Sequence, residues 1–246
     1  MEPDAILERP RLERRLDDVM TRRLGLVIAG AGYGKSTLAA AWAADRSTAW
    51  CALDAGARDV RVLARRLFRA LDVVVPGLPS ELEAAAQRVG ADGEDEAQSV
   101  RADRLAALVC ESLEARLEDD LVIVIDDLHE LPAEDAGLRF IEGLVRGAPP
   151  RLHLLITSRW PMPFPIERLR GQGQVVELSG GQLRFDRDEL AALLEGLDPP
   201  APHLVEALQA RTEGWPALVR LVIESMRDEP VDERERVVDR LGEPTG

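Results

Sequence analysis

A glycine-rich segment near the N-terminus carries residue types that bind phosphate groups. Residues 29–37 read AGAGYGKST. Gly30, Gly32 and Gly34 permit backbone turns that a Cβ would obstruct, so successive N–H groups can point at one anion. The flexible ammonium of Lys35 can reach the β- and γ-phosphates of a nucleotide. The segment therefore has the chemistry of a phosphate-binding loop.

The elements on either side of this segment are those that a phosphate-binding loop requires. The apolar run 26–28 predicts a buried strand, and residues 38–44 predict a helix. The N-terminus of that helix adds unsatisfied N–H groups and the positive end of its dipole. The hydroxyl of Ser36 can bind Mg²⁺. Tyr33 and Thr37 complete the predicted nucleotide-binding set in this loop.

One residue departs from the strict pattern G-x-x-x-x-G-K-[ST]. Ala29 stands where that pattern has its first glycine. The alternative interpretation is a glycine-rich turn beside a chance Gly-Lys-Ser. However, Lys35 is the only lysine in the chain, and the other 30 of the 31 basic residues are arginine. Because the chain uses arginine at every other basic position, the single lysine at the motif position favours a nucleotide site over a chance match.

Two carboxylates follow a second apolar run. Residues 121–125 predict a strand of a parallel sheet covered on both faces, and Asp126 and Asp127 come at its C-terminal end. We predict that Asp126 is the Walker B acid that holds Mg²⁺, and that Asp127 orients or deprotonates an attacking water. The alternative for both is a helix N-cap, and for Asp127 the two interpretations stay open. His129 either faces the γ-phosphate or is simply solvated.

A third apolar run ends in hydroxyls and an arginine. Residues 152–156 predict a strand, and Thr157, Ser158 and Arg159 follow it. An arginine at that position can distinguish ATP from ADP through one charge-assisted contact with the terminal phosphate. The alternative is an exposed arginine in an arginine-rich chain. We predict the sensor role, so the candidate catalytic residues are Asp126, Asp127 and Arg159.

Hydrophobic periodicity predicts an α/β protein. Two further strands are expected at residues 47–53 and 174–178. Helices are expected at about residues 10–20, 60–71, 81–89, 100–117 and 134–145, and an acidic surface loop at 90–97. This order predicts a P-loop core with a mainly parallel, doubly wound sheet.

The pattern changes to helices after residue 180. Asp186 and Glu189 have the spacing of a capping box, and further helices are expected at 203–212 and 217–226. The sequence therefore predicts two domains: a nucleotide-binding core over residues 1–178 and a small helical domain over 179–246.

Composition excludes several functional classes. The net charge of −14 argues against a nucleic-acid-binding surface in these 246 residues. The acidic N-terminus lacks a signal peptide, and the longest apolar run, 38–44, is too short for a membrane span, so we expect a cytoplasmic protein without membrane contact. Cys51 and Cys110 are expected to be reduced core residues. The three histidines lack metal-ligand spacing.

These motifs in this order resemble the nucleotide-binding module of the STAND signal-transduction ATPases, and in particular of the MalT-like large LuxR-type transcriptional regulators. The matching segments are Arg9-Pro10-Arg11-Leu12, residues 31–37, Ala49-Trp50, residues 125–129, residues 157–159, Leu183-Arg184-Phe185 and residues 212–216. Gly30 stands where the family has a proline, so a looser loop is expected here.

The resemblance implies an ATPase core that binds ATP or ADP with Mg²⁺, followed by a small helical domain. It also implies that Pro216 packs against the adenine, with Arg9 and Pro10 on the opposite side. Family members continue into a winged helix, a sensor and a DNA-binding helix-turn-helix. Either this chain is truncated before those regions or its parent protein lacks them. We expect truncation, with DNA contact occurring only through the missing regions.

Three functions remain in competition. The favoured one is a nucleotide-gated switch in a transcriptional regulator: ADP holds a closed monomer, ATP promotes a homo-oligomer, and slow hydrolysis resets the state. The second is a free-standing turnover ATPase that needs an arginine finger from another subunit. The third is a non-catalytic P-loop scaffold for protein binding, against which Lys35, Ser36 and Asp126 argue.

Overall fold

The protein is described by a computed structural model that covers residues 7–91, 98–197 and 201–240. Of the expected acidic loop, residues 92–97 lie outside this described part, and residues 90 and 91 belong to a helix. Residues 198–200 lie outside it as well.

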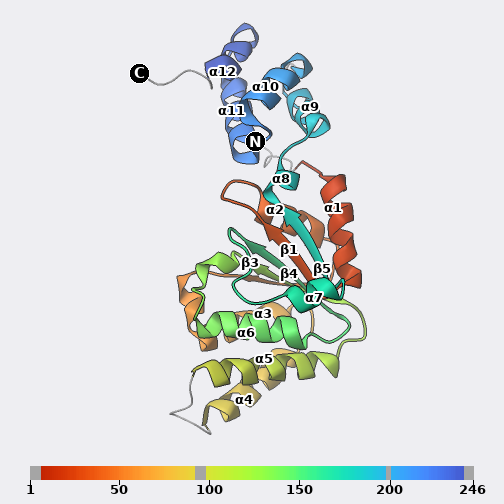
Figure 1. Ribbon diagram of the computed structural model, residues 1–246, viewed down its shortest axis with the longest axis vertical. Coiled ribbons are helices and arrows are strands. Elements are labelled where there is room, and N and C mark those ends of the chain that lie inside the picture. Colours follow the sequence, from red (N-terminus) through yellow and green to blue (C-terminus); the bar gives the residue numbers. More distant parts are fainter. Residues whose placement is uncertain (1–6, 92–97, 198–200, 241–246) are drawn as a thin grey trace.

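Five strands form one parallel sheet, as expected (Figure 1). Their order across the sheet is β2-β3-β4-β1-β5, and every neighbouring pair is parallel. The strands are β1 (Leu24–Ile28), β2 (Thr48–Ala52), β3 (Leu121–Asp126), β4 (Leu152–Ser158) and β5 (Val175–Ser179). Strands β3 and β4 are buried along their whole length because helices cover both faces of the sheet.

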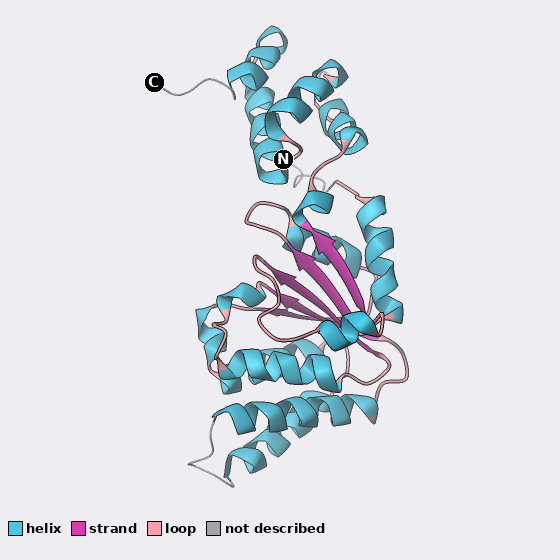
Figure 2. Cartoon of the chain, in the orientation of Figure 1, coloured by secondary structure: helices cyan, strands magenta, loops and turns pink. Residues whose placement is uncertain are grey.

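Helices cover the sheet on both sides (Figure 2). On one face lie α1 (Pro10–Asp17) and α2 (Lys35–Ala43), whose apolar side chains form a cluster with Val27, Val124 and Leu178. On the other face lie α3 (Val60–Asp72) and α6 (Ala136–Gly147), followed outward by α5 (Gln98–Glu114) and α4 (Leu78–Ala91). The doubly wound α/β fold is therefore confirmed.

A small helical unit follows the sheet at one end of the molecule (blue in Figure 1). It consists of α9 (Arg187–Glu195), α10 (Val205–Thr212), α11 (Pro216–Asp228) and α12 (Arg234–Arg240), and the short helix α8 (Gly180–Leu183), whose Leu183 packs in the core cluster, connects it to β5. Helices α9 to α12 share a separate apolar cluster that includes Leu190, Leu208 and Val219. The capping box is confirmed: Glu189 N donates to Asp186 Oδ1 at 2.9 Å, and Asp186 N donates to Glu189 Oε2 at 3.0 Å. The division after residue 178, one residue before β5 ends, stays a prediction.

Several short helices and 3₁₀ turns were not predicted from the sequence. The first helix is shorter than expected, and a 3₁₀ turn, Asp18–Thr21, continues it. Helix α7 (Glu167–Gly171) was not expected, because five residues are too few to display a helical period. Helix α12 forms within the charged tail and buries Val238 completely. Further 3₁₀ turns span Ala55–Arg58, Leu128–Glu130, Pro202–Leu204 and Val231–Glu233.

Candidate nucleotide-binding site

The glycine-rich loop connects the end of β1 to the start of α2. Gly32 and Gly34 both have φ of +75°, a left-handed backbone conformation that favours glycine. Helix α2 begins at Lys35, directly after Gly34. Within the described residues, the N–H groups of Gly30, Gly32 and Gly34 donate to no protein acceptor. The loop thus offers donors at a helix N-terminus, which is an anion-binding arrangement.

The only lysine of the chain is buried beneath this loop. Lys35 is 7% exposed, and its Nζ donates to the carbonyl oxygen of Gly30 at 3.1 Å. Burial lowers the pKa of the Lys35 ammonium, and so does the positive charge of Arg159, whereas Asp127 and Asp126 oppose the shift. A phosphate group beside Lys35 would favour the charged form in the same way as these carboxylates.

Two strands and a helix bring three oxygen-bearing side chains together. Ser36 Oγ donates to Asp126 Oδ1 at 2.9 Å, and Thr157 Oγ1 donates to the same oxygen at 2.5 Å. Hydroxyl and carboxylate oxygens are hard ligands of the kind that Mg²⁺ prefers. In the described part of the chain, no group of three or more His, Cys, Asp or Glu side chains could hold a metal ion. The oxygens of Ser36 and Asp126 lie close together and suit a Mg²⁺ ion that takes its remaining ligands from phosphates and water.

Asp127 lies at the same edge of the sheet in an unusual conformation. Its φ of +62° is left-handed, and it directly precedes the 3₁₀ turn Leu128–Glu130. Its backbone N–H donates to Thr157 Oγ1 at 2.9 Å, while its carboxylate makes no capping hydrogen bond. The N-cap interpretation of Asp127 thus lacks the side-chain bond that defines a cap. Its part in catalysis stays a prediction, as does the sensor role of Arg159.

His129 is buried, which differs from the expectation of a solvated loop histidine. Its side chain is 5% exposed and lies between two carboxylates, with Nδ1 3.7 Å from Asp127 Oδ1 and Nε2 3.6 Å from Glu130 Oε1. Neither ring nitrogen has a hydrogen-bond partner among the described residues. The sequence did not indicate this because the apolar run ends at Ile125, and nothing after it signals burial of the 3₁₀ turn.

A pocket opens beside the loop, between the core and the helical unit. Arg9, Pro216 and Thr37, which the sequence analysis assigned to nucleotide binding, all line it. Pro10 is exposed in the first turn of α1 and is not among the lining residues. The complete lining is Leu7, Arg9, Glu13, Gly34, Thr37, Leu38, Ala41, Phe185, Pro216 and Arg220. The assignment of this pocket to adenine stays a prediction.

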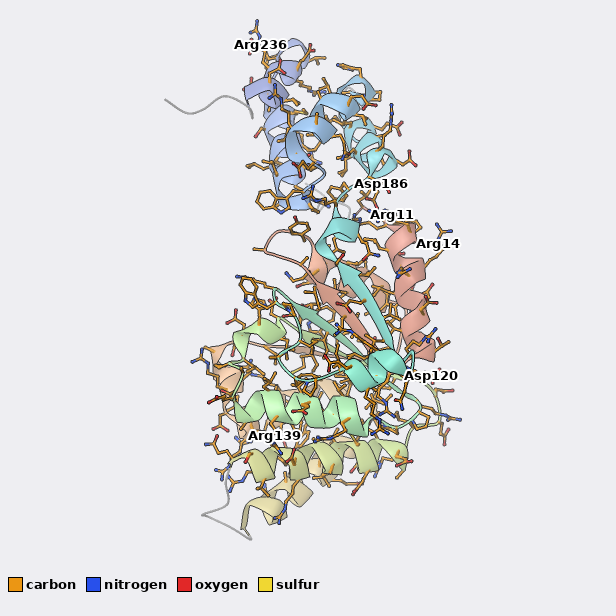
Figure 3. The ribbon with its side chains drawn as sticks, viewed as in Figure 1. Arg11, Arg14, Asp120, Arg139, Asp186 and Arg236 are labelled. Carbon is orange, nitrogen blue, oxygen red and sulfur yellow. The ribbon has the colours of Figure 1, made fainter. Side chains whose placement is uncertain are left out.

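Arg9 joins this pocket to the helical unit. Its Nε and Nη2 donate to the two oxygens of Glu189 at 3.0 and 2.9 Å, and its guanidinium lies 4.6 Å from the centre of the Phe185 ring. Arg11 adds a second ion pair to Glu189 at 3.0 Å. It also forms an ion pair with Asp186 at 2.7 Å, and these two residues are labelled next to each other in Figure 3. Burial would raise the pKa of the Glu189 carboxyl, but the hydrogen bonds from the two arginines hold it below its usual value.

The glycine-rich loop also contacts the helical unit directly. The backbone N–H of Ala217 donates to the carbonyl oxygen of Gly32 at 2.9 Å. The rings of Tyr33 and Trp215 lie 6.5 Å apart at an angle of 39°. A Cβ at Gly32 would stand 2.6 Å from the Cβ of Ala217, so only glycine permits this approach. The sequence offered no signal for this contact, which depends on tertiary packing.

Three features together define the class of P-loop ATPases: the glycine-rich loop, the Ser36 and Asp126 oxygens suited to Mg²⁺, and the parallel sheet. Residues 7–157 match the AAA ATPase domain family, and the chain belongs to this family. It also resembles the regulator MalT in sequence and a STAND protein in fold, as the motifs predicted.

Relatives and solved structures agree with this assignment. The chain is 34% identical to the serine/threonine-protein kinase PknK of Mycobacterium tuberculosis over 227 residues, and 32% identical to the HTH-type transcriptional regulator MalT of Yersinia enterocolitica over 236 residues. These matches cover 87% and 95% of this chain but only 19% of PknK and 25% of MalT. The chain therefore spans about a fifth to a quarter of the length of these relatives.

Among solved structures, a STAND protein with a tetratricopeptide repeat sensor from Pyrococcus horikoshii shares the fold. It has a TM-score of 0.60 and 18% identity, over 99% of this chain and 34% of that one. A Walker-type ATPase of Pyrococcus abyssi has a TM-score of 0.52 and 13% identity, over 96% of this chain and 71% of that one. Within the described residues, no helix is long and apolar enough to cross a membrane.

Proposed function

We propose that this chain is the ATP- and ADP-binding module of a signal-transduction switch. ADP holds the module in a closed, monomeric form, ATP promotes self-association, and slow hydrolysis of ATP returns it to the closed form. A ligand shifts such an equilibrium only by binding one form better than the other. The module therefore needs a physical connection between the phosphate site and the part that moves.

The observation that carries this proposal is the hydrogen bond between Gly32 of the loop and Ala217 of α11. Any rearrangement of the loop around an additional phosphate displaces the acceptor of that bond. Arg9 provides a second connection, because it lines the pocket and is paired with Glu189 of the helical unit. Both connections join the nucleotide site to α9 and α11, and we infer that these helices respond to the bound nucleotide.

Within this scheme each side chain has a separate task. Lys35 and the loop N–H groups bind the β- and γ-phosphates, and Ser36 and Asp126 hold Mg²⁺. The ion supplies positive charge that stabilises the phosphoryl group during transfer. Asp127 accepts a proton from the attacking water, and Arg159 contacts the terminal phosphate. The exposed position of Arg159, at the end of β4, allows it to meet a ligand at this edge of the sheet.

The names of the relatives support a nucleotide-binding module whose effector activity belongs to other regions of the protein. One relative is named as a protein kinase and the other as an HTH-type transcriptional regulator, and this chain matches only a minor part of each. We infer that the shared segment senses nucleotide and that regions outside it act on DNA or other partners. The buried free thiols of Cys51 and Cys110 are consistent with a cytoplasmic protein, in which thiols stay reduced.

Thermal unfolding with nucleotides tests the binding step. A ligand at about 100 times its Kd adds about 2.7 kcal/mol of stability, and each kcal/mol raises Tm by about 2–4 °C at this size. We expect Mg-ATP and Mg-ADP to raise the Tm of the parent by several degrees. The variant Lys35→Ala should fold and show no shift. A shift of equal size in Lys35→Ala would overturn the loop assignment.

Mass and turnover measurements then separate the competing functions. Multi-angle light scattering should give a monomer with ADP and a larger species with Mg-ATP. Phosphate release should be slow, well below one turnover per second. Rapid turnover with no change in mass would support the free-standing ATPase instead, and failure to bind any nucleotide would support the scaffold. Nucleotide carried through purification is checked by denaturing the protein and assaying what is released.

A further inference from the structure

A second cavity lies where α3, α4 and α5 meet, and residues from all three helices line it. Figure 1 shows α4 and α5 at the end of the molecule opposite the helical unit. The cavity has a volume of about 620 Å³, which is in the range of sites that hold a ligand rather than a single ion. It shares no lining residue with the pocket beside the glycine-rich loop. We call it the α3 groove.

Four arginines line the α3 groove. Arg61, Arg65 and Arg69 lie four residues apart on one face of α3, and all three are exposed. None of the three forms an ion pair or a side-chain hydrogen bond with another described residue. Arg101 of α5 contributes the fourth guanidinium, and it is 8% exposed. Glu83 is the one acidic residue of the lining, so positive charge dominates the groove.

The three arginines of α3 repel one another. Like charges at positions i and i+4 destabilise a helix, and this stripe contains two such pairs. The only acidic residue of α3 is its last one, Asp72. The rest of the chain is strongly acidic, with a net charge of −14 for the whole protein. An anion that covers the stripe would relieve this repulsion, so the free protein favours binding of negative charge here.

The base of the α3 groove is apolar. Ala64 and Phe68 alternate with the arginines along α3, and Leu105 comes from α5. All three side chains are buried. A row of cations beside an apolar base suits a ligand that has both carboxylates and apolar side chains. Helical peptides that lay an apolar face into a groove combine these features when their flanking residues are acidic.

The spacing of the arginines matches that of carboxylates on a second helix. An α-helix rises about 1.5 Å per residue, so neighbouring arginines of the stripe lie about 6 Å apart along the axis and the stripe spans about 12 Å. Carboxylates four residues apart on a partner helix repeat at the same interval. We propose that the α3 groove binds an amphipathic, acidic helix of another protein. This docking does not require the proposed nucleotide switch.

A nucleic acid fits the α3 groove less well. Double-stranded DNA carries one charge per about 1.7 Å of its axis, so most of its phosphates would extend beyond a stripe of about 12 Å. They would then face a protein whose net charge is −14. The DNA backbone also offers no apolar side chain to the base of the groove. The charge and the apolar base together favour a peptide.

Fluorescence anisotropy with a synthetic peptide tests the proposal. The labelled probe is a helical peptide with three glutamates spaced four residues apart and leucines on the adjoining face. It should bind the parent, and Arg65→Glu should raise its Kd at least about tenfold. Raising the salt from about 50 to about 500 mM should also weaken binding at least about tenfold, because salt screens exposed charges.

Arg15→Glu is the matched control for the charge reversal. Arg15 is exposed on α1, which covers the opposite face of the sheet, and it forms no ion pair with another described residue. The Kd for the peptide should stay within about twofold of the parent value, since the net charge changes equally but far from the groove. An equal loss of binding in Arg15→Glu and Arg65→Glu would overturn the proposal, because only the net charge would then matter.

Variant peptides test each part of the groove separately. A peptide with glutamine in place of glutamate should lose the interaction with the arginines, and one with serine in place of leucine should lose the apolar contact. Each should bind the parent at least about tenfold more weakly. A peptide with lysine as its central charged residue should bind Arg65→Glu more tightly than it binds the parent. Failure of this charge exchange would overturn the proposed contact at Arg65.

Two further measurements exclude indirect causes. The Tm of Arg65→Glu should be no lower than that of the parent, because the substitution removes both like-charge pairs of the stripe. Its Kd for Mg-ADP should stay within about twofold, since the groove is separate from the loop. A peptide that binds a protein unable to bind Mg-ADP would overturn the nucleotide function and support the groove.

Three outcomes would assign the α3 groove differently and overturn the proposal. The first is failure of the parent to bind the glutamate peptide. The second is binding of a labelled DNA duplex that Arg65→Glu abolishes and the peptide does not displace. The third is self-association of the parent at low salt without nucleotide that Arg65→Glu abolishes, which would make a second copy of this chain the partner. Light scattering measures the third.

Discussion

The carbonyl oxygen of Gly32 accepts a hydrogen bond of 2.9 Å from the backbone N–H of Ala217. The first group belongs to the tip of the glycine-rich loop and the second to the first turn of α11. An N–H in the first turn of a helix has no partner within its own helix, so the loop caps α11 from outside. The phosphate loop is therefore part of the junction with the helical unit as well as a binding element.

This contact should break when a methyl group is added to the loop. Gly32→Ala places a Cβ 2.6 Å from the Cβ of Ala217, in a backbone with φ of +75°. We expect the free energy of unfolding to fall by about 2–4 kcal/mol, because the clash and the strained backbone both destabilise the folded protein. Amide hydrogen exchange should show faster exchange at Ala217.

Gly34→Ala is the matched control for this variant. Gly34 has the same φ of +75°, but a Cβ there would meet no atom within 4 Å. Gly34→Ala should lower the free energy of unfolding by about 1–2 kcal/mol, because alanine is strained in this backbone conformation. It adds no clash, so amide hydrogen exchange at Ala217 should stay as slow as in the parent. Equal exchange at Ala217 in both variants would show that the clash does not open the junction.

The buried carboxylate of Glu189 should make the junction sensitive to acid. The pKa of this carboxyl is held below its usual value, so its contribution to stability is complete above about pH 4.5 and is lost as the pH falls through the lowered pKa. Glu189→Gln removes one side of a buried ion pair and should cost about 3 kcal/mol at pH 7. In urea titrations, the difference in free energy of unfolding between the parent and Glu189→Gln should become smaller below about pH 4.

Glu195→Gln provides the control on the same helix, because Glu195 is exposed. Its free energy of unfolding should stay within about 0.5 kcal/mol of the parent at every pH. A gap between parent and Glu189→Gln that is constant with pH would mean that the carboxylate charge contributes nothing at the junction.

Substitutions of the two adjacent aspartates, Asp126 and Asp127, should affect nucleotide binding and ATP turnover differently. Asp126→Asn weakens the oxygen set that suits Mg²⁺, so the gain in nucleotide affinity on adding Mg²⁺ should largely disappear. Asp127→Asn should retain that gain and lose about 10²–10⁴ in turnover, the usual contribution of a general base. Titrations of a fluorescent ADP with and without Mg²⁺, together with phosphate release, measure both effects. If Asp127→Asn hydrolyses ATP at the parent rate, Asp127 is not the proton acceptor.

The two cysteines should be inert in the folded protein. Burial raises the pKa of both Cys51 and Cys110 to about 11. At pH 8 only about one thiol in a thousand is then ionised, and the thiolate is the reactive form. An aromatic disulfide reagent should therefore modify both thiols at least about 100 times faster in urea than in buffer. The variants Cys51→Ser and Cys110→Ser assign the two rates, and rapid reaction of the native protein would contradict this expectation.

The central strands of the sheet could be predicted from sequence because they are almost entirely apolar. Residues 121–125 are all apolar, and His153 is the one polar residue in 152–156, which is the pattern of a parallel sheet covered on both sides. The capping box at Asp186 was equally predictable, since its two hydrogen bonds depend on residues three apart. Helices as short as α7 were missed because a local period needs about two turns to show.

The site was predictable only in part. The proximity of Ser36 to Asp126 follows from strand order and loop position, and the structure brings the two together. Thr157, which donates to Asp126 and accepts from Asp127, was recognised only as a hydroxyl at a strand end. The pairing of Arg9 with Glu189 spans 180 positions in the sequence, and neither residue carries a local signal for the other.

The pocket beside the loop draws on segments that lie far apart in the sequence, from Leu7 and Arg9 to Pro216 and Arg220. During synthesis the N-terminal part emerges and folds first. The glycine-rich loop, its sheet and its covering helices are therefore present before α11 has left the ribosome. A nascent chain that ends before Pro216 has the phosphate loop without the complete pocket, so the full nucleotide site forms only once α11 has been synthesised.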